Sequence, residues 1–251
     1  MKKLISLTAL FFQIACGGGG GGNGASPPVF DNGGNRGGAG NLSWNSSVTD
    51  AEANVYRTAE YQVNSSLEQI KAAQAYALLA KNGKEVAGSG VTIAIVDTGV
   101  GITRTEIAPN YQSAGSFDYV NNDADPTDDQ GHGTNVASIA AGAEDGNLSH
   151  GVAYESSIMA MKVLGSGTSG GTDDDVASGI AGAADAGAQV INLSLGVQNG
   201  GTSPLARLGM IYAAASDSLM VVSAGNQAFL QPGYPARYAS DASLQGYVIA
   251  V

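Results

Sequence analysis

The chain has 251 residues, enough for one α/β domain with appendages and a sizeable hydrophobic core. Lys and Arg number 11 against 22 Asp and Glu, and the net charge of −11 argues against binding to nucleic acid or to anionic membrane surfaces. The single cysteine, Cys16, excludes an internal disulfide.

The first 16 residues have the features of an export signal. Lys2 and Lys3 precede an apolar stretch, residues 4–15, that is too short to cross a bilayer. The ending Gln13-Ile-Ala-Cys16 resembles a bacterial lipoprotein signal, in which the thiol is lipidated and becomes the mature N-terminus, although Gln13 replaces the usual aliphatic residue. The alternative is an ordinary signal peptide that contains a cysteine. We therefore expect export from a bacterial cell, with a lipid anchor on Cys16 at the outer membrane or cell surface, or secretion.

Residues 17–54 are rich in Gly, Asn and Ser and contain few apolar side chains. Such a segment cannot bury enough surface to offset its chain entropy, so we expect a disordered tether. The domain is then expected over residues 55–251, with regular structure beginning near Ser65.

Apolar residues after Ser65 repeat at helical intervals as far as Gly83, and Ser66 and Gln69 have the spacing of a capping box. Residues 91–96 form an unbroken, β-branched run, which is typical of a parallel strand buried on both faces. Further strands are expected at 158–164, 190–195, 219–224 and 247–251, and helices after His132, at 173–187 and at 204–216. This alternation predicts a three-layer α/β fold, a doubly wound, mostly parallel sheet with helices on both faces.

Three polar residues stand at the ends of these elements. Asp97 closes the first strand, His132 opens the next helix between two glycines, and Asn226 ends the strand that contains residues 221–225. Sites in such sheets gather at the carboxyl ends of the strands. An aspartate can orient an imidazole, and an amide can donate to a developing oxyanion. Each residue alone could be a cap or turn residue, but all three in this order favour a catalytic site.

The motifs that contain these residues resemble the subtilisin-like serine proteases, the subtilases. The resemblance rests on residues 95–100 (IVDTGV), 131–137 (GHGTNVA), 151–153 (GVA), 161–164 (MKVL), 191–196 (INLSLG), 221–226 (VVSAGN) and 234–236 (YPA). These segments follow the family's order over roughly residues 65–251. The resemblance implies an endopeptidase in which Asp97 orients the imidazole, His132 is the general base and Asn226 is the oxyanion donor.

The resemblance also implies how a polypeptide substrate would bind. The extended substrate would pair with Ser169, Gly170 and Gly171 on one side and with Ser194, Leu195 and Gly196 on the other. Ala224 and Gly225 would wall the pocket for the residue before the scissile bond.

The largest departure from the family is the nucleophile. Its Gly-Thr-Ser-Met-Ala run has no match after Asn226, and the two Gly-Thr-Ser runs, 167–169 and 201–203, both precede that residue. We therefore expect an amino-terminal part of a longer protein, incomplete at the C-terminus, inactive alone and with its serine beyond residue 251. A carboxy-terminal autotransporter barrel is one partner such a protein could have. The alternative is a non-catalytic remnant of the fold.

No cofactor is expected. Relatives often hold calcium at the loop equivalent to residues 144–149, but this loop is short, so that site is not carried over. The acidic run from Asp123 to Asp129 could bind Ca²⁺, although its composition favours a solvated loop. Asn135 replaces a histidine common in the family, and His150 is interpreted as structural.

A dinucleotide-binding domain is the competing interpretation. Residues 165–170 form a GxGxxG run between a strand and a helix, with Asp185 further on. However, Asp173, Asp174 and Asp175 open that helix, so three anions stand where a pyrophosphate would have to bind.

Overall fold

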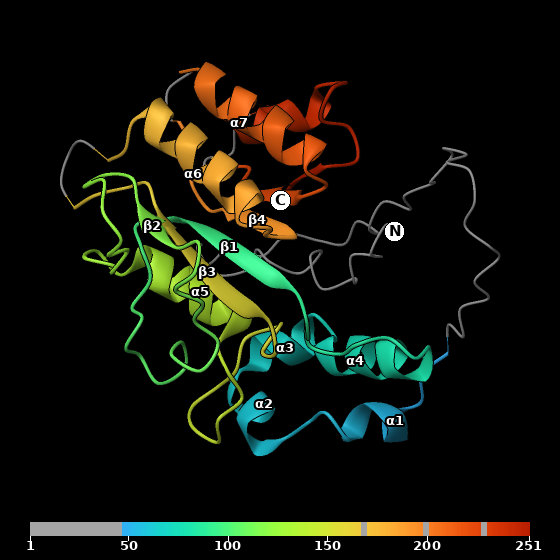
Figure 1. Cartoon of the computed structure of the whole chain (residues 1–251). Coiled ribbons are helices and arrows are strands. Elements are labelled where there is room, and N and C mark those ends of the chain that lie inside the picture. The colour runs from blue at the N-terminus through green and yellow to red at the C-terminus, as the bar shows by residue number, and fades with distance from the viewer. Residues whose placement is uncertain (1–46, 167–169, 198–200, 227–229) are drawn as a thin grey trace.

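The computed structural model describes residues 47–166, 170–197, 201–226 and 230–251. Within them, six strands form one sheet in the order β2-β3-β1-β4-β5-β6, and every neighbouring pair is parallel (Figure 1). The strands are β1 (Thr92–Asp97), β2 (Phe117–Asp118), β3 (Ser157–Lys162), β4 (Val190–Leu193), β5 (Leu219–Val222) and β6 (Val248–Ala250). The predicted parallel α/β sheet is confirmed.

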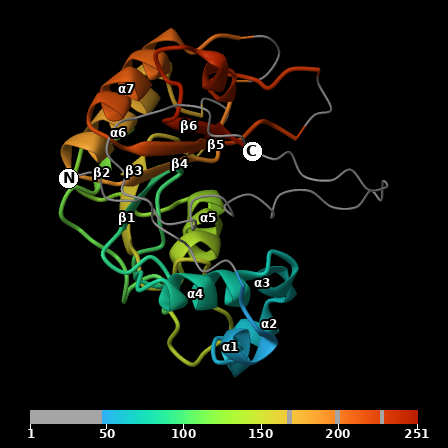
Figure 2. The ribbon, with the colours of Figure 1, turned by 90° about the vertical axis from the view of Figure 1, so that its right-hand side faces the viewer.

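Helices cover both faces of the sheet (Figures 1 and 2). Helices α6 (Asp173–Asp185) and α7 (Pro204–Ala215) pack on one face, and α5 (His132–Ala141) packs on the other. Because successive side chains of a strand point to opposite faces, β1 contributes to both cores. Ala94 and Val96 pack with α6 and α7, whereas Ile93 and Ile95 pack with α5. This arrangement explains the unbroken apolar run of β1.

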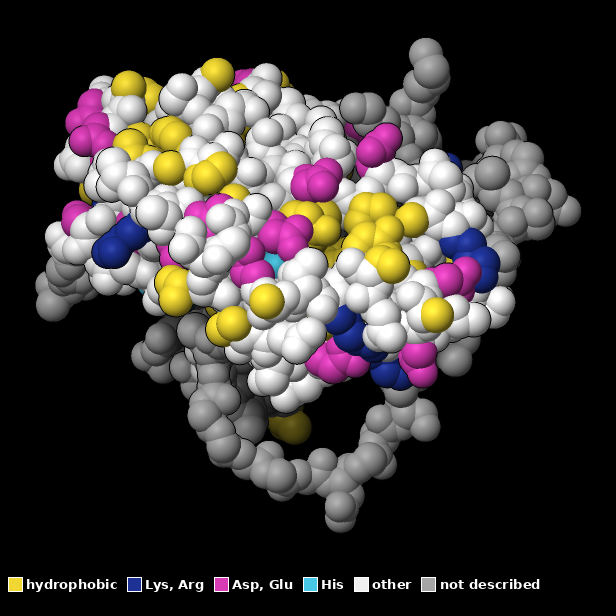
Figure 3. Space-filling model, turned by 90° about the horizontal axis from the view of Figure 1, so that it is seen from below, with side chains coloured by type: hydrophobic (Ala, Val, Ile, Leu, Met, Phe, Trp, Pro, Cys, Tyr) yellow, Lys and Arg dark blue, Asp and Glu magenta, His cyan; other side chains and the backbone are white. Residues whose placement is uncertain are grey.

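Four short helices precede the sheet: α1 (Asp50–Asn54), α2 (Ala59–Val63), α3 (Ser65–Gln69) and α4 (Ala72–Lys81). They lie together at one end of the molecule, beyond α5 (Figure 2). Tyr61 and Tyr76 are buried in their common core, and the Tyr76 hydroxyl donates a 2.5 Å hydrogen bond to the carbonyl of Val152. Figure 3 shows acidic and hydrophobic side chains side by side on the face seen from below. Val63 and Leu148 are among the exposed apolar residues of the described part of the chain.

Three expectations for this region differ from the structure. Helix α1 lies inside the segment expected to be a tether, because Thr49 and Glu52 form a capping box and Ala53 is buried. The cap near Ser66 is Asn64, whose side chain accepts from the Ser66 amide. In addition, Lys71 has a φ of 57°, which separates α3 from α4 where one helix was expected. The end near Gly83 agrees with the prediction, since α4 ends at Lys81.

The observed strands β4 and β5 end two residues before their predicted ends. Ser194, Leu195 and Gly196 therefore follow β4 as a loop, and Ala224, Gly225 and Asn226 follow β5 in the same way. The short strand β2 and the 3-10 helix η2 (Ala236–Ser240) were not predicted. Among the helices of the described residues, none is both long and apolar enough to cross a membrane.

Candidate active site

The structure brings Asp97 and His132 together at the carboxyl end of β1. Asp97 Oδ1 lies 2.7 Å from His132 Nδ1, and it also accepts a 2.7 Å hydrogen bond from the Thr98 amide. The Asp97 side chain is fully buried, whereas 36% of the His132 side chain is exposed. The imidazole thus lies between a buried carboxylate and solvent.

Glycines on both sides of His132 allow this approach. Gly131 is the N-cap of α5 and has a φ of 98°, a left-handed conformation that other residues rarely adopt. At Gly133 the reason is space, because a Cβ there would lie 2.2 Å from the carbonyl oxygen of Gly99. The first turn of α5 therefore packs directly against the end of β1.

The contact with Asp97 determines the protonation chemistry of His132. The hydrogen bond that His132 donates to Asp97 raises the pKa of His132 above the ordinary 6.5, burial of the ring opposes this shift, and the charges of Asp97 and Asp128 add to it. An ionised carboxylate can only accept hydrogen bonds, so Nδ1 carries the proton that faces Asp97. Nε2 is then the basic nitrogen, which is the arrangement a general base requires.

The acidic run is exposed at Asp123 and Asp125, as its composition favoured, whereas Asp128 is partly buried and binds the residues around the pair. Asp128 Oδ1 accepts from the Thr98 hydroxyl at 2.9 Å and from the amides of Gln130 and Gly131 at 3.0 and 2.9 Å. Its Oδ2 accepts from the Thr134 amide at 2.9 Å and the Thr134 hydroxyl at 2.5 Å. Burial opposes ionisation of Asp128, but these hydrogen bonds outweigh burial and lower the pKa of Asp128 to about 2.

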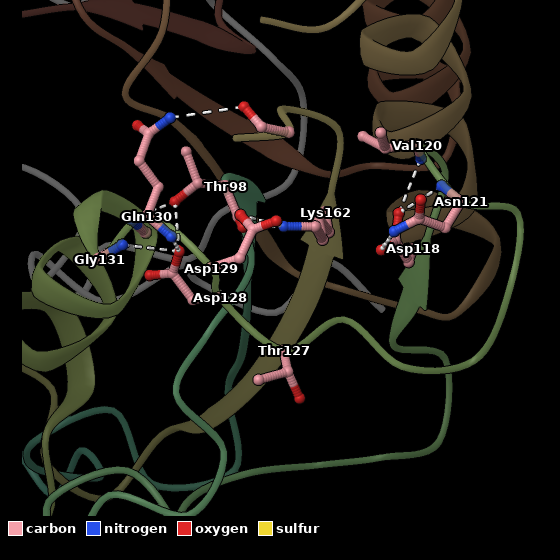
Figure 4. A network of polar contacts seen from close by, with 12 residues as sticks. Thr98, Asp118, Val120, Asn121, Thr127, Asp128, Asp129, Gln130, Gly131 and Lys162 are labelled. Atoms are coloured by element: carbon pink, nitrogen blue, oxygen red, sulfur yellow. Dashed lines mark hydrogen bonds and ion pairs between the residues drawn. The ribbon is translucent and has the colours of Figure 1, made fainter. Parts of the chain in front are cut away.

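Asp129 also faces a buried group. It forms a 2.8 Å ion pair with Lys162, whose side chain is 2% exposed, and Lys162 also donates to the carbonyl of Thr98 at 2.8 Å (Figure 4). Sequence reasoning missed Thr98, Asp128, Thr134 and Lys162. One signal was present for Asp128, because a carboxylate just before a helix is a common capping feature.

The Subtilase family model matches residues 88–251 of this chain. The chain belongs to the subtilase family. It is 42% identical to thermitase from Thermoactinomyces vulgaris over 156 residues, which are 61% of this chain and 53% of thermitase. It is 36% identical to subtilisin DY from Bacillus licheniformis over 157 residues, 61% of this chain and 55% of that protein.

Solved structures agree with this assignment. Sphericase superposes with a TM-score of 0.53 at 32% identity, covering 65% of this chain and 53% of sphericase. A cold adapted subtilisin-like serine proteinase gives a TM-score of 0.52 at 33% identity, covering 60% of this chain and 52% of that one. The predicted family and three-layer fold are confirmed, and the dinucleotide-binding interpretation is set aside. The chain spans about half the length of these relatives.

Asn226, Ala224 and Gly225, which were also predicted site residues, follow β5 at the same edge of the sheet. Asn226 is exposed in the loop after β5, and within the described residues no hydrogen bond joins it to Asp97 or His132. Ala224 donates to the carbonyl of Val251 at 2.7 Å, and Gly225 has a φ of 103°. The loop that carries Asn226 therefore leaves the sheet two strands away from Asp97.

The two proposed substrate-binding segments follow β3 and β4, the strands on either side of β1. Gly170 and Gly171 lie near the end of β3, where the Gly165 amide donates to the Gly170 carbonyl at 3.2 Å. Ser194, Leu195 and Gly196 follow β4, and Leu195 packs on the main core. Ser169 and Cys16 lie outside the described residues.

Carboxylates at and beside the loop of residues 144–149 bind protein donors in the structure. Within residues that the structure describes, no three His, Cys, Asp or Glu side chains are grouped to hold a metal ion. Glu60 instead accepts from the Gly146 amide at 2.8 Å, and the Thr58 hydroxyl donates to Glu144 at 3.0 Å. The carboxylates are thus directed at protein donors. His150 is buried against Tyr61 and Tyr154, which agrees with a structural role.

Proposed function

We propose that this subtilase is a serine endopeptidase in which His132 is the general base and Asp97 orients it. One observation carries the proposal: the 2.7 Å contact between His132 Nδ1 and the buried carboxylate of Asp97. This contact occurs in a family with relatives such as the thermophilic serine proteinase of Bacillus sp. (strain AK1), 40% identical over 152 residues.

In the proposed mechanism, a serine hydroxyl attacks the peptide carbonyl while His132 Nε2 takes the hydroxyl proton. The tetrahedral intermediate then expels the amine, which receives that proton from His132, and leaves an acyl-enzyme. Water attacks the acyl-enzyme while His132 takes its proton, and the second intermediate collapses to a carboxylic acid and the free serine, which receives the proton back. Asp97 stabilises the imidazolium that forms between these transfers. The Asn226 amide and a backbone N–H donate to the oxyanion.

We further propose that the serine comes from outside residues 1–251. No Gly-Thr-Ser-Met-Ala run follows Asn226, and the matched relatives are about twice as long as their matched part. Residues 1–251 alone should then retain at most the weak activity of an enzyme that lacks a triad member.

The proposed substrate is an extended polypeptide. Its backbone would pair with Ser169, Gly170 and Gly171 on one side and with Ser194, Leu195 and Gly196 on the other, while Ala224 and Gly225 would wall the pocket for the residue before the scissile bond. Support comes from the topology of the sheet. The first two segments follow β3 and β4, which lie on either side of β1, and the third follows β5, the neighbour of β4. The segments offer mainly backbone groups and small side chains.

The test uses the full-length natural protein, a fluorophosphonate probe and a chromogenic peptide. Asp97→Asn should lower kcat by about 10⁴-fold, because the imidazole loses its orienting carboxylate.

Asn226→Ala should lower kcat by about 10²–10³-fold with KM similar, the loss known for oxyanion donors. Asn135→Ala, an exposed position on the same helix as His132, is the control. Full activity in Asp97→Asn would overturn the proposed roles, and strong probe-sensitive hydrolysis by residues 1–251 would overturn the location of the serine.

We propose, finally, that the protein is exported and carries lipid on Cys16. Support comes from the sequence, where the sole cysteine directly follows an apolar stretch in a lipoprotein-like signal. Metabolic labelling with an alkyne fatty acid should mark the wild type and leave Cys16→Ala unmarked, and only the wild type should partition with membranes. Equal partition of both proteins would show that Cys16 is not the anchor.

A further inference from the structure

We propose that Asp128 is a positioning residue for His132, which holds the end of β1 and the first turn of α5 at a fixed separation. The inference rests on the proposed function of His132 as the general base. Asp128 does not contact His132 directly through a hydrogen bond in the described residues; it binds the residues around the catalytic pair.

The two carboxylate oxygens of Asp128 bind neighbours of both members of the pair. Thr98, which donates to Oδ1 at 2.9 Å, is the residue after Asp97. Gly131 precedes His132 and donates to Oδ1 at 2.9 Å, and Thr134 donates to Oδ2 through its amide and its hydroxyl. One carboxylate therefore connects the backbone that carries Asp97 to the backbone on both sides of His132.

The Thr98 hydroxyl extends this connection. While it donates to Asp128, it accepts a 2.9 Å hydrogen bond from the Gly133 amide. Thr98 is buried, and hydrogen bonds in such surroundings are stronger than in water. The hydroxyl thus ties the first turn of α5 to β1 at a second point.

A separate ion pair holds the segment that carries Asp128. Asp129, the next residue, binds the buried Lys162 of β3, and Lys162 binds the Thr98 carbonyl (Figure 4). Three elements, β1, β3 and α5, are therefore fixed to residues 128–129. These contacts fix the position of the Asp128 carboxylate relative to β1 and β3, and the carboxylate in turn fixes the first turn of α5.

An asparagine cannot replace this carboxylate. Asp128 accepts five hydrogen bonds, three on Oδ1 and two on Oδ2. An amide has one acceptor oxygen and presents an NH₂ group in place of the other. Asp128→Asn must therefore lose either the two bonds from Thr134 or the three from Thr98, Gln130 and Gly131.

The expected effect in the full-length protein is a loss in kcat of about 10- to 100-fold per active site, because small displacements of a catalytic group cost rates of this order. KM should change little, since Asp128 is not among the proposed substrate-binding residues. The pKa of His132 should fall, because the Asp128 charge and the contact with Asp97 both raise it. Loss of the Asp128 charge by itself also lowers this pKa, so the pKa shift is read together with kcat and with the Thr98 variants, which change no charge.

Matched variants separate these effects. Asp125→Asn makes the same charge change three residues earlier, at an exposed carboxylate that binds Thr127, and it should keep wild-type kcat. Thr98→Val removes the bridging hydroxyl and should lose activity, whereas Thr98→Ser retains it and should keep most of the activity. If Asp128→Asn does not fold, the Thr98 pair decides the question.

The measurements are kcat and KM per titrated active site, the acid limb of kcat/KM, and the NMR titration of the His132 imidazole. The NMR titration needs no turnover, so it tests the positioning role even if the wild type cleaves no peptide, a result that would reject the proposed function alone. A lowered His132 pKa with reduced kcat in Asp128→Asn supports the proposal. An unchanged His132 pKa, or equal activity of Thr98→Val and Thr98→Ser, would overturn it.

Discussion

The pair of Asp97 and His132 combines complete burial of one side chain with partial exposure of the other. Burial strengthens the hydrogen bond to the imidazole because the surroundings screen it less than water does. Exposure leaves Nε2 open to a reacting group. The pair can therefore stabilise an imidazolium and still exchange its proton with a substrate.

The pH dependence of activity follows from the His132 pKa. In its proposed role as the general base, His132 must be neutral to accept a proton. We therefore expect kcat/KM to fall as the pH drops through the raised pKa of His132, and the acid limb to lie above the ordinary 6.5. Asp97→Asn should move this limb to lower pH. The free energy of unfolding changes with pH in the opposite direction to the activity. The contact of protonated His132 with Asp97 stabilises the folded protein fully below the pKa that His132 has in the unfolded chain, and this stabilisation is lost as the pH rises through the pKa of His132 in the folded protein. A pH profile with its limb below 6.5 would contradict this assignment.

At the same scale, the sequence could indicate Asp97 and His132 but not the residues that support them. Both stand at the ends of elements whose apolar patterns are clear, so their common edge follows from the parallel sheet. Asp123, Asp125, Asp128 and Asp129 look alike in the sequence. Thr98, Thr134 and Lys162, brought near by the fold, bind Asp128 and Asp129, and these contacts distinguish the two from Asp123 and Asp125.

Among the elements, helix α5 requires a small residue in its first turn. Gly133→Ala should lower the stability by about 1–3 kcal/mol, because the added Cβ would lie 2.2 Å from the Gly99 carbonyl oxygen and the helix must shift. That shift would move His132, so kcat should fall by about 100-fold. Asn135→Ala on the exposed face of the helix is the control. Chemical denaturation and active-site-titrated kinetics measure the two effects, and a fully active Gly133→Ala would show that the helix tolerates the methyl group.

The four amino-terminal helices depend on a buried hydrogen bond. Tyr76→Phe should destabilise the protein by about 1–3 kcal/mol, because the Val152 carbonyl loses its 2.5 Å partner inside a core. Tyr56→Phe is the matched control, since Tyr56 packs edge-on against Tyr76 and is only partly buried; it should change the stability by less than about 0.5 kcal/mol. Equal denaturation midpoints for both variants would show that this hydrogen bond adds nothing.

The elements that sequence reasoning missed share a physical property. Helices α1 and α2 have five residues each, which is too short for a helical repeat of apolar side chains, and Thr49 and Thr58 cap them. Strand β2 has two residues and exists because it pairs with β3. By contrast, β1 and α6 were predicted because a buried strand and a capped helix both leave long patterns.

For the whole molecule, acidic groups lie near the carboxyl edge of the sheet. The backbone of Asp123 forms an antiparallel bridge with Asp118 at the end of β2. Asp174 lies in the first turn of α6, the helix that follows β3. Both side chains are exposed, and the chain carries a net charge of −11. A field of this sign attracts cationic substrates and repels anionic ones over distances that salt shortens.

This field predicts how salt changes the activity of the full-length protein. For a peptide with lysines placed away from the cleavage site, kcat/KM should fall severalfold between about 20 and 200 mM NaCl, because the Debye length shortens from about 20 to about 7 Å. A glutamate-flanked peptide of the same core should show the opposite trend, and a glutamine-flanked one should change little. The difference should appear mainly in association, so kcat should stay constant. If all three peptides respond alike, salt acts on the stability or on the chemistry, and the acidic edge does not steer substrates.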